Sequence, residues 1–228
     1  FEIGTEELPV ADLDHLVEQL DQRLPALLAD LRLEHGTLHT YGTPRRLVAH
    51  VEAVAPRQPD LEQVVKGPPA ERAFDALGQP NKAAEGFARS KGVALSDLQV
   101  REMDGGRYVA AVVFHAGRPA GEVLAEALPG LIAGLKVDKS MRWNHTNVSF
   151  SRPIRWLLAL YGAQVVPFEY AGLQSGNTTR GLRFTEPEAL LVDSPAVYYQ
   201  ALKAQGIILN TAERQQRILE QVQHLAAS

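Results

Sequence analysis

The feature that most constrains the fold is a stripe of leucines near the amino terminus. Apolar side chains recur at intervals of three and four residues from Leu13 to Leu31, which is the period of an amphipathic α-helix. The pattern predicts a helix over about residues 10–33 that ends near His35-Gly36. Pro25 lies inside this stripe and has no backbone N–H to donate, so we expect a kink or two abutting helices.

Strands are expected in three pairs of segments that alternate in polarity or are rich in β-branched and aromatic residues. The pairs are residues 37–41 with 47–54, 100–103 with 107–114, and 154–161 with 164–170. Asp104-Gly105-Gly106 is the strongest hairpin signal, because glycine adopts positive φ without steric cost. Residues 154–161 alone are also compatible with a buried helix.

Further helices are predicted from capping residues and apolar spacing. They cover residues 70–77, 80–91, the stretch from Val123 to Leu135, a segment opened by Ser194-Pro195, and a last helix that starts near Asn210. The last helix is expected to bury Ile218, Leu219, Val222 and Leu225. Residues 56–69 contain several prolines and little periodicity, which predicts a loop or an edge passage.

Helices and hairpins without strict β-α alternation predict an α+β chain with mixed, largely antiparallel sheets and flanking helices. For 228 residues we expect two or three small domains. The expected ranges are an α/β domain over 1–66, a helical and hairpin domain over 67–138, and a β-hairpin with helices over 139–228. The chain begins at Phe1 rather than methionine and its last helix lacks a stop signal, so we expect a fragment cut at both ends.

Composition excludes several classes of protein. With 45% hydrophobic and 22% charged residues, the chain has the composition of an ordinary soluble globular protein. No apolar run approaches the roughly 20 residues of a membrane span, and no secretion signal is visible. Zero cysteines exclude disulfides, thiolate zinc sites and cysteine nucleophiles, and the sequence has no phosphate-binding glycine loop and no nucleophile elbow.

Glu2, Glu6 and Glu7 form the most obvious carboxylate cluster. Carboxylate oxygens that converge on one point can hold a hard cation such as magnesium. However, no Asp or His completes a ligand set nearby, and acids just before a helix are favoured by the helix dipole. We therefore predict no metal site and no catalytic residue in this chain.

Positive charge is concentrated in one block of an otherwise acidic chain. Residues 1–30 carry eight acids and one base, whereas residues 136–183 carry seven bases and two acids, a net charge of +5. Guanidinium groups bind phosphate bidentately, and tryptophan beside arginine can stack on an unpaired base. The predicted RNA-binding residues are Arg45, Arg46, Lys66, Lys139, Arg142, Arg152, Arg155, Arg180 and Arg183. Within one strand, Arg155 is the better surface residue and Trp156 the better core residue.

Seven segments together resemble one protein family. They are FEIGTEELP at residues 1–9, YGTPRRL at 41–47, KGPP at 66–69, NKAAEGFARSKG at 81–92, KSMRW at 139–143, FSRPIRWLLAL at 150–160 and SGNTTRGLRF at 175–184. In this order and spacing they resemble the amino-terminal part of the bacterial glycyl-tRNA synthetase beta subunit. The resemblance extends through essentially the whole chain.

The resemblance implies a division of labour between two subunits. In that family the alpha subunit holds the class II aminoacylation core, where ATP, magnesium and glycine bind, and the beta subunit supplies surface for tRNA. It also implies a cytoplasmic heterotetramer of two alpha and two beta chains, with no cofactor in this fragment and no role at a membrane. The amino-terminal region is further similar to the body and tail of archaeal CCA-adding enzymes, which hold the acceptor and elbow of tRNA.

Three functions remain open at this point. In the first, the region is not catalytic and helps to orient tRNA for glycylation by the alpha subunit. In the second, the motifs form the alpha–beta interface, where the arginines pair with acids of the partner and RNA is bound elsewhere on the beta chain. In the third, which the small number of metal ligands disfavours, Glu2, Glu6 and Glu7 serve a nucleotide-processing enzyme with magnesium.

Overall fold

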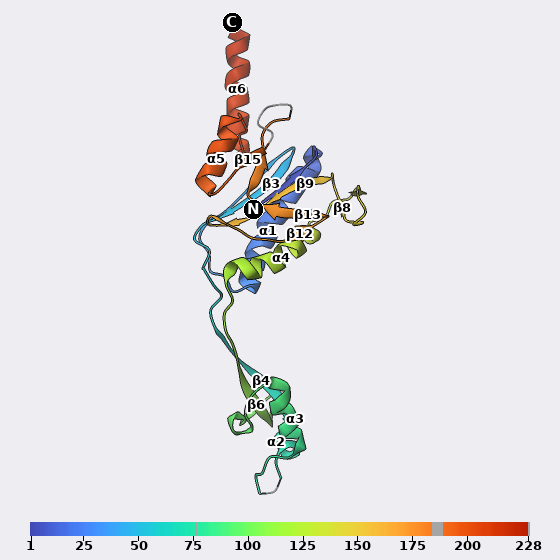
Figure 1. The fold of residues 1–228 in the computed structure, drawn as a ribbon, viewed down its shortest axis with the longest axis vertical. Coiled ribbons are helices and arrows are strands. Elements are labelled where there is room, and N and C mark those ends of the chain that lie inside the picture. The colour runs from blue at the N-terminus through green and yellow to red at the C-terminus, as the bar shows by residue number, and fades with distance from the viewer. Residues whose placement is uncertain (76, 184–188, 228) are drawn as a thin grey trace. The chain divides into compact units, whose positions relative to one another are not determined.

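The computed structural model describes residues 1–75, 77–183 and 189–227 and has the α+β composition predicted from the sequence (Figure 1). The chain divides into two compact units, one formed by Phe1–Gln58 with Pro119–Ser228 and the other by Pro59–Arg118. The second unit is an insertion within the first, whereas the predicted ranges break the chain after residues 66 and 138. No helix in the described ranges is long and apolar enough to span a membrane.

The first unit is built on a six-stranded sheet in the order β12-β13-β9-β1-β3-β2. Its strands are β1 (Glu2–Thr5), β2 (Leu38–Thr43), β3 (Arg46–Val51), β9 (Ile154–Leu158), β12 (Glu169–Tyr170) and β13 (Leu173–Gly176). Neighbouring strands are antiparallel except β13 and β9, which are parallel. The amino-terminal strand therefore lies inside the sheet, between two strands that are distant from each other in the chain.

Helix α1 (Val10–Asp30) packs with α4 (Ala120–Gly134) over one face of this sheet. The leucine stripe explains the packing, since Leu16, Leu20 and Leu28 are buried in one cluster with Ile3 of β1. α1 is a single continuous helix through Pro25. The expected helix is therefore confirmed, while the alternative of two abutting helices is wrong.

The opposite face carries a smaller core that contains Val48 and Leu158, because neighbouring side chains of a strand point to opposite faces. Helix α5 (Pro195–Ala204) covers this core with Tyr198 and Leu202. Ser194 caps α5 as predicted, since its side chain accepts a hydrogen bond from a backbone N–H of the first turn. A two-stranded sheet of β14 (Thr178–Arg180) and β15 (Ala189–Leu191) precedes α5.

The last helix, α6 (Thr211–Ala227), forms as predicted but does not bury its apolar stripe. Ile218, Leu219, Val222 and Leu225 are between 53% and 72% exposed, so the expectation that they are buried is wrong. Periodicity predicts that a helix is amphipathic, whereas the element that covers its apolar face depends on tertiary contacts outside the pattern.

Two short hairpins complete the first unit. β7 (Met141–Arg142) pairs with β8 (Ser149–Phe150), and β10 (Leu160–Tyr161) pairs with β11 (Gln164–Val165) around Gly162, whose φ is +60°. The strand interpretation of residues 154–161 is therefore confirmed over the buried-helix alternative. The predicted hairpin is confirmed only at β10 and β11, because β9 pairs with β1 and β13 instead.

The second unit is a three-stranded antiparallel sheet in the order β4-β6-β5 with short helices. Its elements are β4 (Leu61–Pro69), α2 (Ala70–Ala73), α3 (Lys82–Lys91), the 3-10 turn η1 (Leu95–Asp97), β5 (Gln99–Met103) and β6 (Gly106–His115). The hairpin of β5 and β6 is confirmed, with positive φ at Asp104 and Gly105. The helix predicted over 80–91 is α3, whereas the one predicted over 70–77 ends at Ala73.

For residues 56–69 the edge-passage alternative is confirmed, because β4 is an edge strand of the three-stranded sheet, and the loop alternative is wrong from Leu61 to Pro69. Its backbone pairs with β6 from Leu61 to Lys66 and again at Pro69, with a register shift between the last two. Proline cannot donate a ladder hydrogen bond, so it is tolerated only at strand ends and irregularities. The loop prediction failed because the prolines lie at the two ends of the segment, and residues 60–67 between them contain none.

Candidate nucleic-acid interface

Trp156 of β9 forms the centre of the candidate site and is only 7% exposed. It lies opposite Gly4 in the pairing of β9 with β1. A Cβ atom added at Gly4 would lie 1.9 Å from the indole ring, which is far inside van der Waals contact. Glycine at this position therefore lets the ring lie directly against the backbone of β1, and the prediction of Trp156 as a core residue agrees with its burial.

Three guanidinium groups surround the same indole ring. The Cζ atoms of Arg45, Arg46 and Arg180 lie 5.8, 5.6 and 5.3 Å from the ring centroid. Arg45 lies in the turn between β2 and β3, Arg46 begins β3, and Arg180 ends β14. Such distances are within the range of cation–π attraction, so Trp156 draws together positive charges from separate segments.

Arg46 and Glu2 form a buried ion pair beneath this ring. Arg46 Nη1 lies 3.2 Å from Glu2 Oε1, and the two side chains are 2% and 0% exposed. Burial raises the pKa of the Glu2 carboxyl, and the charge of Arg46 opposes that effect. Arg46 also donates to Thr179 Oγ1 at 3.2 Å and to the Arg180 carbonyl at 2.7 Å. Its guanidinium therefore fastens β14 to β3, and its burial leaves it no surface for a direct phosphate contact.

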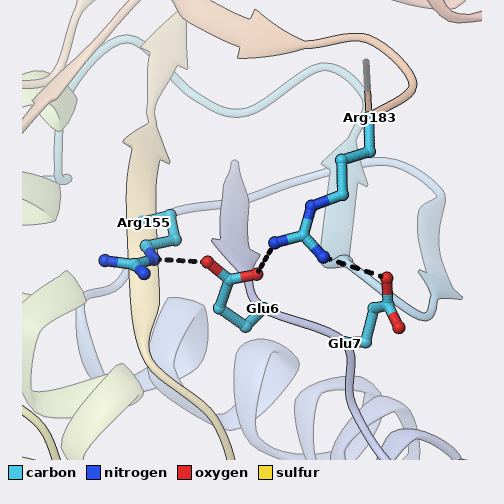
Figure 2. Close-up of polar contacts among 4 residues, drawn as sticks. All are labelled: Glu6, Glu7, Arg155 and Arg183. Carbon is cyan, nitrogen blue, oxygen red and sulfur yellow. Dashed lines mark hydrogen bonds and ion pairs between the residues drawn. The ribbon is translucent and has the colours of Figure 1, made fainter.

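The exposed part of the site is built around Glu6 (Figure 2). Glu6 Oε1 accepts a hydrogen bond from Arg155 Nε at 2.7 Å, and Glu6 Oε2 accepts one from Arg183 Nη2 at 3.2 Å. Arg183 Nη1 lies 3.5 Å from Glu7 Oε1. The hydrogen bond from Arg155 is the main cause that lowers the pKa of Glu6. As predicted, Arg155 is a surface residue, with 49% of its side chain exposed.

We call Arg45, Arg46, Arg155, Arg180 and Arg183 the arginine cluster. Its net charge with Glu2, Glu6 and Glu7 is +2. The pKa of Arg45 is lowered, mainly by burial and also by the charges of Arg183, Arg46 and Arg180, while Glu6 opposes this shift. The carboxylates thus offset only part of the positive charge of the arginine cluster, and the site retains an attraction for anions.

The other four predicted residues lie outside the described contacts of the cluster. Arg142 donates to the Asn147 carbonyl at 3.2 Å and Arg152 to the Ser151 carbonyl at 3.1 Å, so both bond within their own segments. Lys139 is exposed between α4 and β7. Lys66 belongs to the second unit.

Lys66 has a local environment of its own within the second unit. Its ammonium group lies 2.6 Å from Asp104 Oδ2 and 3.6 Å from the centroid of the Tyr108 ring. The hydrogen bond with Asp104 raises the pKa of Lys66. This lysine therefore braces the turn of the β5–β6 hairpin against β4.

The structure places each of the three glutamates against an arginine rather than in a shared ligand set. Within the described ranges no group of three or more His, Asp or Glu side chains is placed to hold a metal ion. Sequence reasoning missed these ion pairs, although the acidic block at residues 1–30 and the basic block at 136–183 carried a signal for them. Opposite charge alone gave no means of assigning individual partners.

A cleft of about 570 Å³ opens beside Phe1, between β3 and β10. Its described lining is mostly apolar and includes Leu24 of α1, Leu124 of α4 and Tyr198 of α5. A cleft of this composition suits apolar groups rather than phosphate, so we place the candidate interface at the arginine cluster.

Comparison with known proteins agrees with the resemblance read from the motifs. The profile of a family described as Glycyl-tRNA synthetase beta subunit matches residues 1–228. The chain is 45% identical over 228 residues to the Glycine–tRNA ligase beta subunit of Desulforamulus reducens. The match covers all of this chain and 33% of that protein. It is also 45% identical over 227 residues to the Glycine–tRNA ligase beta subunit of Moorella thermoacetica, again 33% of that protein.

A plant relative extends the comparison. The chain is 47% identical over 228 residues to Glycine–tRNA ligase, chloroplastic/mitochondrial 2, of Arabidopsis thaliana and covers 21% of it. The chain thus spans about a third of the length of the bacterial relatives named above and less of the plant one. Since the family profile covers every residue and these identities extend over the whole chain, the chain belongs to the glycyl-tRNA synthetase beta subunit family.

Proposed function

We propose that this chain is a tRNA-binding, non-catalytic part of a glycine–tRNA ligase and that it holds the RNA backbone at the arginine cluster. The observation that supports this most directly is that Arg45 of the β2–β3 turn and Arg180 of β14 lie against Trp156. Arg155 of β9 and Arg183, which follows β14, meet nearby at Glu6, whose charge also acts on Arg45. Arg155 and Arg183 have about half of their side chains exposed, and Arg45 and Arg180 are partly exposed. These four are the phosphate-contacting residues of the proposal.

The chemistry of the cluster determines what kind of recognition it can supply. Guanidinium groups grip phosphate oxygens bidentately and carry no information about base sequence. The cluster would therefore position tRNA in general, and selection of the glycine tRNA would come from other contacts. In this scheme glycine, ATP and magnesium bind to an alpha subunit, with which the whole beta chain forms a cytoplasmic heterotetramer.

A binding titration tests the proposal. Gel shifts of the chain with tRNA, scrambled RNA and DNA at two salt concentrations should show binding that weakens steeply with salt, by about 0.7–0.9 in log–log slope for each phosphate contact. Arg155→Ala with Arg183→Ala should lower both the affinity and the slope. Arg217→Ala on α6, whose side chain is 64% exposed, serves as the matched control for loss of a surface arginine. Binding that barely responds to salt contradicts the proposal.

The pairing of Arg155 and Arg183 with carboxylates favours one alternative, in which the same surface is the alpha–beta interface and RNA binds elsewhere on the beta chain. Arginine and aromatic side chains are enriched in protein interfaces as well. Charge reversal at Arg180 and Arg183 separates the two functions. Loss of association with the alpha subunit while RNA binding persists supports the interface, and the reverse result supports RNA binding.

A further inference from the structure

Glu6 lies between two guanidinium groups that come from distant segments of the chain (Figure 2). Arg155 Nε donates to one carboxylate oxygen at 2.7 Å, and Arg183 Nη2 donates to the other at 3.2 Å. Two arginines thus hold both oxygens of a single anion. A backbone phosphate of RNA also presents two unesterified oxygens that share one negative charge, and guanidinium groups bind such oxygens in the same manner.

We propose that Glu6 takes the place of one RNA phosphate in the unbound protein, and that RNA binds by displacing this carboxylate from Arg155 and Arg183. The inference rests on the proposed function and adds to it a defined phosphate subsite with a competitor built into the chain. Glu6 then sets how strongly a polyanion must bind before the subsite opens.

The structure allows the carboxylate to leave while the backbone stays in place. The Glu6 N–H donates to the Pro153 carbonyl at 2.9 Å, and the Thr5 N–H donates to the Arg45 carbonyl at 2.8 Å. These main-chain bonds hold the segment independently of the Glu6 side chain. The two arginines are 49% and 48% exposed, and ion pairs open to water are weak because solvent screens them. A polyanion that also contacts Arg45 and Arg180 can therefore replace the ion pairs of Glu6 with Arg155 and Arg183.

Glu7 provides a matched comparison within the same segment. It carries the same charge as Glu6 and is the next residue, but its described ion pair is with Arg183 alone, at 3.5 Å, and its side chain is 65% exposed. Removal of either carboxylate changes the net charge of the protein equally. A general electrostatic effect on RNA affinity would therefore be similar at the two positions, whereas displacement predicts a larger effect at Glu6.

Binding of a tRNA transcript to the chain and to Glu6→Gln and Glu7→Gln variants tests the inference. We expect Glu6→Gln to bind about twofold to thirtyfold more tightly, since two exposed ion pairs no longer compete with RNA. Glu7→Gln should change the affinity by less than about twofold. Glu6→Ala, which leaves no amide between the arginines, should reproduce the gain. Adding Arg155→Gln to Glu6→Gln should remove the gain in RNA affinity.

The outcomes separate this inference from the function on which it rests. Equal gains for Glu6→Gln and Glu7→Gln, or no gain for either Glu6 variant, overturn displacement while RNA binding by the unmodified chain still stands. If the unmodified chain and all variants fail to bind tRNA at low salt, the proposed function fails and the inference fails with it. Circular dichroism of each variant shows whether a change in affinity reflects a change in folding.

Discussion

Replacement of Gly4 by alanine should be among the most damaging single changes that add only one methyl group. The added Cβ would lie 1.9 Å from two atoms of the Trp156 ring, so the ring would have to move by about 1.5 Å to reach normal carbon–carbon contact. Trp156 is 7% exposed and carries three guanidinium groups around its ring. It therefore has little room to retreat without breaking other contacts.

The expected loss of stability in Gly4→Ala follows from two known costs. Overpacking of a core costs about 1–3 kcal/mol in the free energy of unfolding, and complete loss of a buried tryptophan costs about 3–5 kcal/mol. We expect Gly4→Ala to cost about 3 kcal/mol, a large share of the roughly 5–15 kcal/mol that stabilises a typical domain. Gly176→Ala is the control, since Gly176 lies in β13 and an added Cβ there meets nothing within 4 Å.

The assay is urea unfolding followed by tryptophan fluorescence. Trp143, which lies in the first unit together with Trp156, still supplies the signal in variants that lack Trp156. The decisive variant is Gly4→Ala with Trp156→Ala. Once the ring is gone, the methyl group at residue 4 has space, so the double variant should be about as stable as Trp156→Ala alone. A loss below about 1 kcal/mol for Gly4→Ala, or a double variant whose loss equals the sum of both, refutes the reasoning.

Two further predictions concern charge and capping. Arg46→Met should cost about 3–5 kcal/mol because it leaves Glu2 buried without its cation, whereas Arg46→Met with Glu2→Leu should lose much less in the same assay. Ser194→Ala should cost about 1 kcal/mol through the lost cap of α5, measured by thermal unfolding against Ser194→Gly, which should cost only a few tenths.

Local patterns predicted the elements whose side chains and turns carry their own signal. The leucine spacing that begins at Leu13 predicted α1, and Asp104-Gly105 predicted the β5–β6 hairpin because its turn requires positive φ. The pairing partners were not predictable in the same way. β9 pairs with β1 across about 150 residues of chain, and no spacing within either segment states which distant strand lies beside it.

The candidate site was predictable only where a local pattern carries the information. The alternation along β9 predicted that Arg155 faces outward and Trp156 inward, and both predictions are confirmed. The sequence did not indicate that Arg46 is buried, because alternation along β3 assigns a face but not whether that face meets a carboxylate or water. Lys66 was grouped with the arginines by its charge, although its neighbours are Asp104 and Tyr108 of the second unit.

The central position of β1 brings together four segments of the family resemblance that are far apart in the chain. Gly4 lies opposite Arg46 of β3 on one side and opposite Trp156 of β9 on the other. Residues 1–9, 41–47 and 150–160 therefore meet at one point, and Arg46 ties residues 175–183 to it through the Arg180 carbonyl. A change in any one of these segments alters the packing of the other three around Trp156. Their residues are thus constrained by one shared packing arrangement as well as by any ligand, and the exposed side chains of Arg155 and Arg183 are where the two constraints can be separated by mutation.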